Sequence, residues 1–229
     1  MAFSTEEDLR VFLSGRARYP ILTEMPDRSP PSGLMLVVSG PAGSGKTTLC
    51  DRMLNSYDGL SRVITSTSRA PRAGEIDGTD YYFFPPEEFE RMIAEGEFYE
   101  HAQVHGRFYG SLKREIDEKL AAGVDLLLNV DVQGAATYRQ ASLDSEALNG
   151  RVISVFLEIT ADQIRERLDT RGSDDEAEIQ RRIETAQSEL LASKHFDYVI
   201  VSGTKDEDFA RLSEIYLNEK AARQAKVVD

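Results

Sequence analysis

The chain has 229 residues, of which 41% are hydrophobic, enough for a buried core and too many for disorder throughout. Its 40 Asp and Glu outnumber 27 Lys and Arg, so the formal net charge of −13 argues against general nucleic-acid binding. Its single cysteine, Cys50, excludes an intramolecular disulfide, and no apolar run approaches the roughly 18 residues that a membrane span needs. We therefore expect a soluble, cytoplasmic protein with no nucleic-acid partner and no membrane partner.

Residues 1–33 are predicted to form an N-terminal arm and linker. The segment ends in residues 26–33, whose prolines and glycine oppose both helix and sheet. From Leu34 the pattern changes, because continuous apolar runs alternate with segments of helical period. Such strands, separated by helices, are typical of a parallel sheet covered on both faces. The apolar runs are 34–38, 124–128, 152–157 and 198–201.

The first apolar run leads directly into a G-x-x-x-x-G-K-T sequence, after which a helix is expected. Strand, loop and helix in this order make the motif specific for a nucleoside triphosphate. Its glycines let backbone N–H groups converge on phosphate oxygens at a helix N-terminus. We expect Lys46 to reach the β- and γ-phosphates and the Thr47 hydroxyl to bind Mg²⁺. The residues predicted to bind ATP are Gly40, Pro41, Ala42, Gly43, Ser44, Gly45, Lys46, Thr47 and Thr48.

A second basic segment follows at residues 65–75, where Arg69 and Arg72 stand among several hydroxyl side chains. Arginine pairs bidentately with phosphate and keeps its charge, so two at this spacing suit a second phosphate group. Taken alone, the segment is equally compatible with a solvated basic loop. Between about Arg72 and Gly110 short aromatic strands and one short helix indicate a small inserted lobe.

The later helices carry their own start and stop signals. Residues 160–163 and 173–176 match the capping-box pattern, in which side chains satisfy the free N–H groups of a first turn. Leu112, Ile116 and Leu120 share one helical face, and Gly123 is the expected end of that helix.

The order and spacing of these motifs closely resemble the guanylate kinase family, from about Leu34 to Lys220. The resemblance implies an α/β fold of the P-loop nucleoside monophosphate kinase type. Its five-stranded, mostly parallel sheet is flanked by helices and carries a small inserted NMP-binding lobe and a helical lid. The motifs that carry the resemblance are the phosphate loop, residues 65–72, Asp80-Tyr81, Glu100, residues 108–111 and residues 129–134.

The resemblance also implies a division of the chain into domains. An N-terminal arm and linker over 1–33 precedes a guanylate kinase-like domain over 34–220, and a C-terminal tail follows over 221–229. Within the domain, the GMP-binding lobe is expected at about 65–110 and the lid at about 160–185.

The resemblance assigns the residues that hold GMP. Glu100 is expected to accept hydrogen bonds from guanine N1–H and the 2-amino group, and Ser111 to donate to O6. Adenine would leave these groups unpaired, a mismatch that can cost on the order of 10⁴ to 10⁵ in discrimination. Taken singly, Glu100 would be a surface acid and Ser111 the N-cap of helix 112–120, and Ser111 is expected to serve as cap as well. The GMP-binding residues are Thr65, Arg69, Arg72, Tyr81, Glu100, Tyr109, Ser111 and Asp131.

The implied reaction is MgATP + GMP ⇌ ADP + GDP by direct in-line transfer, with dGMP as a further acceptor. The acceptor oxygen is already anionic, so no general base is needed. Arg167 and Arg171 are four residues apart and would share a helix face toward the ATP phosphates. The residues expected to stabilise the transferred charge are Lys46, Arg72, Arg167, Arg171 and Arg182.

The chain departs from the family pattern at two places that bear on the donor site. Asn129 stands where the family usually has Asp, so we expect it to hold the metal weakly, through water. Residues 202–204 replace a usual Asn-Asp near the expected position of the ATP base. Three alternatives remain at this point: a non-catalytic peptide-binding module of guanylate kinase fold, a ribose 1,5-bisphosphate kinase, and an NTPase or motor. The sequence leaves monomer or homo-oligomer undetermined.

Overall fold

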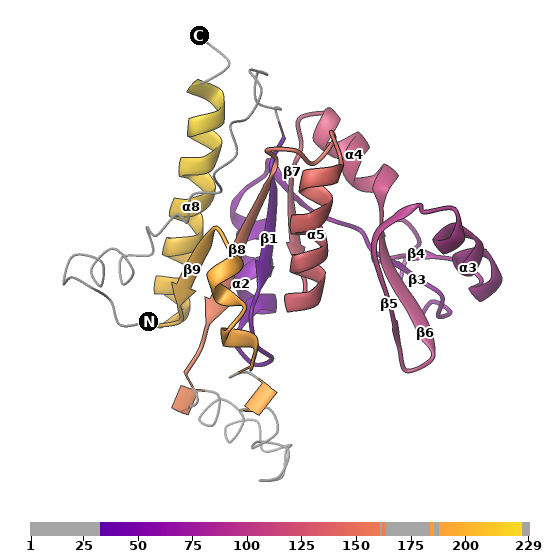
Figure 1. The fold of residues 1–229 in the computed structure, drawn as a ribbon, viewed down its shortest axis with the longest axis horizontal. Coiled ribbons are helices and arrows are strands. Elements are labelled where there is room, and N and C mark those ends of the chain that lie inside the picture. Colours follow the sequence, from indigo (N-terminus) through magenta and orange to yellow (C-terminus); the bar gives the residue numbers. More distant parts are fainter. Residues whose placement is uncertain (1–32, 161, 164–183, 186–187, 226–229) are drawn as a thin grey trace.

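The computed structural model describes residues 33–160, 162–163, 184–185 and 188–225 (Figure 1). The predicted lid residues Arg167, Arg171 and Arg182 lie outside these ranges, as do the capping box at 173–176 and nearly all of the predicted arm. Within the described ranges, no helix is both long enough and apolar enough to cross a membrane.

A parallel five-stranded sheet forms the centre of the molecule, in the order β2-β7-β1-β8-β9. The four predicted apolar runs are confirmed as four of its strands. Strands β1, β7 and β8 are buried along nearly their whole length, whereas in the edge strand β9 only Ile200 is buried. The strands are β1 (Met35–Ser39), β2 (Leu60–Arg62), β7 (Asp125–Asn129), β8 (Val152–Glu158) and β9 (Tyr198–Val201).

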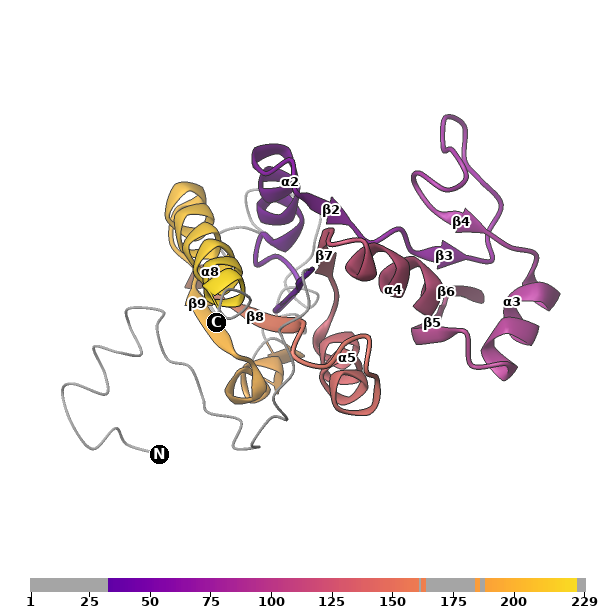
Figure 2. The ribbon, with the colours of Figure 1, turned by 90° about the horizontal axis from the view of Figure 1, so that it is seen from above.

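Helices cover both faces of this sheet (Figures 1 and 2). Alternate side chains of β1 point to opposite faces, so Leu36 packs with α2 (Lys46–Ser56) and α8 (Lys205–Ala225). Val37 packs on the other face with α4 (Lys113–Ala121) and α5 (Val132–Asp144). The α/β fold class is therefore confirmed.

A second, four-stranded sheet in the order β4-β3-β6-β5 forms a lobe beside the main sheet (Figure 2). Phe89 and Met92 of its helix α3 are buried with Phe98 and Leu112 of the hairpin strands. The lobe elements are β3 (Ser66–Thr67), β4 (Tyr82–Phe83), α3 (Pro86–Ala94), β5 (Phe98–Val104) and β6 (Arg107–Leu112). The predicted short strands and short helix are confirmed, although the long β5–β6 hairpin was not anticipated.

Two of the predicted helix signals are confirmed and one is wrong. Thr160 and Gln163 form the expected reciprocal cap, with N···O distances of 3.0 and 3.2 Å. Gly123 follows α4 with φ 82°, as expected of a helix stop. Ser111 does not cap α4, because strand β6 continues through Leu112, which takes the N-cap position with extended backbone. The side chain of Ser111 is instead fully buried in the lobe.

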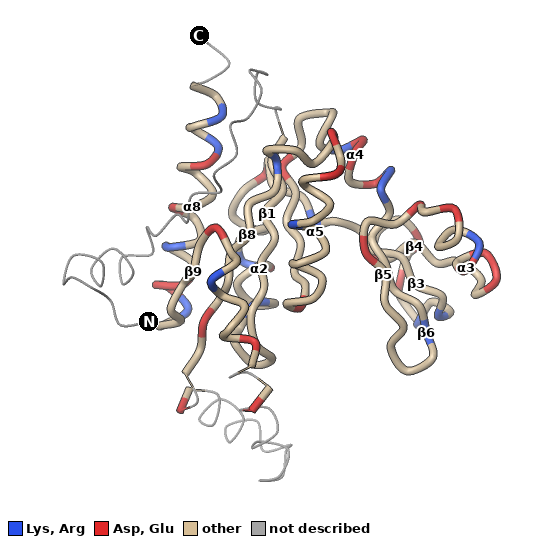
Figure 3. Tube along the Cα trace, in the orientation of Figure 1, with Lys and Arg blue, Asp and Glu red and all other residues tan. Residues whose placement is uncertain are grey.

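The surface helices carry charges of both signs. Acidic and basic positions are interleaved along α3 and α8 (Figure 3).

A short 3₁₀ turn, η1 (Ser193–His195), leads into the last strand β9. Helix α8 then begins after Thr204, whose hydroxyl accepts from the Glu207 N–H while the Glu207 carboxylate accepts from the Thr204 N–H.

Candidate active site

The phosphate loop joins the central strand β1 to α2 at the carboxyl end of the sheet, as predicted. Gly40 has φ 143°, and a Cβ there would lie 2.4 Å from the carbonyl oxygen of Leu157, so only glycine fits. Gly45 takes the N-cap position of α2 with φ 98°. The loop therefore presents backbone N–H groups and the positive end of a helix dipole to one point, an arrangement suited to phosphate.

Lys46 reaches back over this loop. Its Nζ donates to the carbonyl oxygens of Gly40 at 2.6 Å and Pro41 at 2.9 Å. Burial lowers the pKa of Lys46, while the negative groups around it, Glu189 first among them, act to raise it. The ammonium group is thus held beside the loop amides, where an anion would meet both.

The two residues predicted to hold a metal lie together. The amide of Asn129, at the end of β7, donates to Thr47 Oγ1 at 3.3 Å. Rotation of the Asn129 side-chain amide by about 180° would place its oxygen beside the Thr47 hydroxyl. Both are hard oxygen ligands, which Mg²⁺ binds together with water. The donor set therefore fits a hydrated magnesium ion.

The predicted second anion site is assembled in the lobe. The Arg69 guanidinium lies 5.3 Å from the centroid of the Tyr81 ring, and the rings of Tyr81 and Tyr109 are 6.4 Å apart in an edge-to-face arrangement. Thr65 lies one residue before β3, and its carbonyl oxygen accepts from the Tyr82 N–H. Arg69, Tyr81 and Tyr109, three of the residues predicted to bind the GMP phosphate, thus lie together.

Glu75 binds this basic segment, a contact that the sequence did not predict. Its carboxylate accepts from Arg69 Nη1 at 2.7 Å and Nη2 at 2.6 Å, and from the Arg72 N–H at 2.6 Å. These hydrogen bonds, led by those from Arg69, lower the pKa of Glu75 to about 2. The same ion pair raises the pKa of Arg69. Arg69 and the Arg72 amide therefore already bind one planar anion, which supports the interpretation of an anion site over a solvated loop.

The residues predicted to contact guanine also come together. Glu100 and Ser111 face each other across the β5–β6 hairpin. Burial raises the pKa of Glu100, and the negative charge of Asp131 raises it further, so the two carboxylates are neighbours. Asp131 takes the N-cap position of α5, where its Oδ1 accepts from the Gly134 N–H at 2.8 Å. A carboxylate of the lobe and a carboxylate at the end of the main sheet thus influence each other.

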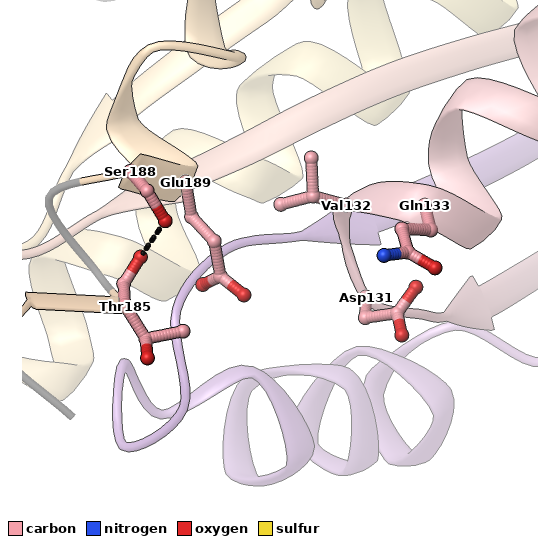
Figure 4. Close-up of a pocket in the computed structure, with 6 residues that line it drawn as sticks. All are labelled: Asp131, Val132, Gln133, Thr185, Ser188 and Glu189. Carbon is pink, nitrogen blue, oxygen red and sulfur yellow. Dashed lines mark hydrogen bonds between the residues drawn. The ribbon is translucent and has the colours of Figure 1, made fainter. Parts of the chain in front are cut away.

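A cleft of about 320 Å³ opens beside Asp131 (Figure 4). Asp131 and Glu189 lie on opposite sides of it, and α2 passes beneath in this view. Burial raises the pKa of Glu189, and the positive charge of Lys46 opposes this. The sequence did not predict Glu189, because no local pattern distinguishes it from other helix-surface acids. The lining residues are Asp131, Val132, Gln133, Thr185, Ser188 and Glu189.

Known proteins resemble this chain over most of its length. A family model described as guanylate kinase matches residues 32–219. A guanylate kinase of Geobacter sulfurreducens is 40% identical over 197 residues, 86% of this chain and 94% of that protein. One of Caulobacter vibrioides is 40% identical over 195 residues, 85% and 89% of the two chains. The crystal structure of guanylate kinase from Anaplasma phagocytophilum has a TM-score of 0.59 and 31% identity, covering 84% of this chain and 88% of that one.

The coupling between the two carboxylates of the pocket can be measured directly. We expect Asp131→Asn to lower the pKa of Glu100, since it removes the neighbouring negative charge that raises it. A ¹³C NMR titration of the glutamate side-chain carboxyls would give this pKa. Glu118→Gln, at an exposed position on α4, is the control and should leave it unchanged. An identical Glu100 titration in Asp131→Asn would show that the two groups are not neighbours.

Proposed function

Since the chain belongs to the guanylate kinase family, whose reaction is the ATP-dependent phosphorylation of GMP, we propose that it transfers the γ-phosphoryl group directly from MgATP to GMP or dGMP. The observation that carries this proposal is the position of Asp131. It follows strand β7, which pairs with β1 ahead of the phosphate loop, and it is the N-cap of α5, which packs on strand β5 of the lobe. This placement supports donor and acceptor sites that face each other, as an in-line transfer between two nucleotides requires.

The donor phosphates would bind to the loop over residues 40–48. The backbone N–H groups cradle the phosphates, and Lys46 exchanges its two carbonyl contacts for oxygens of the β- and γ-phosphates. Thr47 would hold Mg²⁺ directly and Asn129 through water, and the bound ion would neutralise phosphate charge.

The acceptor phosphate would bind in the lobe. Arg69, Arg72 and the hydroxyls of Thr65, Tyr81 and Tyr109 supply N–H and O–H donors. Glu75 holds the Arg69 side chain in a fixed orientation, which lowers the entropy lost when the phosphate arrives.

Guanine would be selected by Glu100, Ser111 and Asp131. The carboxylate of Glu100 accepts from N1–H and the 2-amino group, and the buried hydroxyl of Ser111 donates to O6. Adenine offers a donor at position 6 and no N1–H, so it would leave these groups unpaired.

The transfer itself needs positioning and charge stabilisation more than covalent chemistry. Lys46 and Arg72 would stabilise the charge shared by donor, transferred group and acceptor. Arg167, Arg171 and Arg182 lie outside the described residues, and the family resemblance is the basis for proposing that they contact the ATP phosphates. Closure over the bound nucleotides would exclude water as a competing acceptor.

The alternatives are not favoured. The guanylate kinases of Geobacter sulfurreducens and Caulobacter vibrioides are each 40% identical to this chain. A peptide-binding module would have no use for Lys46 and Thr47, and a sugar-phosphate kinase would have none for the Glu100 and Ser111 pair. Because both proposed substrates are cytoplasmic nucleotides, we infer a cytoplasmic enzyme.

An acceptor series tests the function. We expect ADP formation with GMP and dGMP, and none above background with AMP, UMP or ribose 1,5-bisphosphate. Lys46→Ala should lower kcat by about 10²-fold to 10³-fold, the usual effect of removing one charge-stabilising donor. Lys205→Ala, at the exposed start of α8, is the matched control and should retain full turnover. Preference for ribose 1,5-bisphosphate, or full activity in Lys46→Ala, would overturn the proposal.

The metal site has its own test. Asn129→Asp adds a negative charge beside Thr47, so the variant should reach half of its maximal rate at a lower Mg²⁺ concentration than the natural protein. The measurement is the initial rate of GMP phosphorylation against free Mg²⁺. Asn149→Asp adds the same charge at an exposed loop position away from the site and should not change the requirement. If Asn129→Asp needs the same Mg²⁺ concentration for half of its maximal rate, Asn129 does not contribute to metal binding.

A further inference from the structure

A buried tyrosine, Tyr138, lies on the helix that packs against the strand carrying Glu100. Tyr138 of α5 is 0% exposed, and its hydroxyl has no hydrogen-bond partner among the described residues. Buried hydroxyl groups are nearly always paired, so an unpaired one calls for a function. The side chains packed around Tyr138 are largely aliphatic and aromatic.

The position of Tyr138 relates it to the predicted base contacts. Its ring packs against Tyr99, the residue before Glu100, with ring centroids 6.2 Å apart. Helix α5 packs on strand β5, on which both of these residues lie. Ser111 is a neighbour of Tyr138: burial raises the pKa of Tyr138, and the side chain of Ser111 acts to lower it.

Ser111 also carries a buried hydroxyl group without a hydrogen-bond partner in the described ranges. Its side chain is 0% exposed, and within the described part of the chain its Oγ is also without a partner. Two unpaired hydroxyls therefore lie where α5 packs on the lobe hairpin, one on the helix and one on strand β6, which pairs with β5.

We propose that Tyr138 is a positioning residue for guanine recognition: its O–H donates to Ser111 Oγ, and the Ser111 O–H is thereby directed at guanine O6. This inference rests on the proposed function and names a residue outside the predicted site.

The chemistry of the two hydroxyls sets the direction of this chain. A phenol is more acidic than an aliphatic alcohol, so Tyr138 is the better donor of the pair. Burial raises the pKa of Tyr138, which therefore keeps its proton at all physiological pH values. If Ser111 donated to Tyr138 instead, the phenolic proton would need an acceptor of its own, and the Tyr138 hydroxyl has none within the described residues.

The direction of these hydrogen bonds, from Tyr138 to Ser111 and from Ser111 to the base, contributes to base selection. Ser111 has one proton, and when Tyr138 occupies a lone pair of its oxygen, that proton is available to an acceptor at position 6 of the base. Guanine and hypoxanthine carry such an acceptor, whereas adenine carries an amino group. A hydrogen-bond chain with both members paired only when O6 is present would favour 6-oxopurines.

Tyr138→Phe tests the inference, because it removes the hydroxyl and keeps the ring. We expect the KM for GMP to rise about 5-fold to 10-fold, the value of one hydrogen bond, with kcat and the KM for ATP nearly unchanged. IMP, which carries O6, should lose affinity by the same factor. 2-Aminopurine riboside 5′-monophosphate, which lacks O6, should bind the variant as it binds the natural protein. In a Ser111→Ala background, Tyr138→Phe should have no further effect on GMP.

Tyr216→Phe is the matched control. It also removes a buried tyrosine hydroxyl, one that donates to Asp125 at 2.8 Å on the opposite face of the sheet, so it should lower thermal stability and leave the KM for GMP unchanged. An unchanged KM for GMP in Tyr138→Phe would overturn the inference. An equal loss for GMP, ATP and the 2-aminopurine nucleotide, or additive effects with Ser111→Ala, would show a purely structural role and overturn it too. Absence of GMP turnover in the natural protein would instead contradict the proposed function itself.

Discussion

The backbone at Gly40 sets the geometry on which the donor site depends. Its left-handed conformation and its approach to the Leu157 carbonyl leave no room for a side chain, so β1 can turn sharply into α2 between two parallel neighbours. The turn points the loop amides outward and gives Lys46 two carbonyl oxygens on which to rest. A cation and a set of amide dipoles are thereby fixed at the carboxyl edge of the sheet before any ligand arrives, and such preorganisation is the main source of electrostatic catalysis.

Asp131 connects this edge to the lobe. As the N-cap of α5 it is held by the Gly134 amide, and its negative charge acts on both Lys46 and Glu100. Burial raises the pKa of Glu100, and repulsion from the negative charge of Asp131 raises it further. A guanine base, with adjacent N1–H and 2-amino donors, would relieve that repulsion, which AMP could not do.

The sequence predicted the parts whose signal is local. The buried strands appear as continuous apolar runs, and the phosphate loop has a fixed spacing of glycines and Lys46. The resemblance to a known family predicted the pairing of Glu100 with Ser111, and the structure brings these residues together. Three features could not be predicted, because each depends on tertiary packing. They are the ion pair of Glu75 with Arg69, the interaction of Glu189 with Lys46 and the burial of Tyr138. Ser111 was wrongly expected to cap a helix for the same reason: the strand pairing of β6 extends one residue past it and overrides a favourable local signal.

A crystal structure of the protein with ADP, Mg²⁺ and GMP bound is the most direct test of the proposed acceptor site. We expect the GMP phosphate on the side chains of Arg69 and Arg72. We also expect guanine N1 and N2 within hydrogen-bond distance of the Glu100 carboxylate, and O6 at the Ser111 hydroxyl. GMP seated elsewhere, with Glu100 and Ser111 turned away from the base, would contradict the proposal.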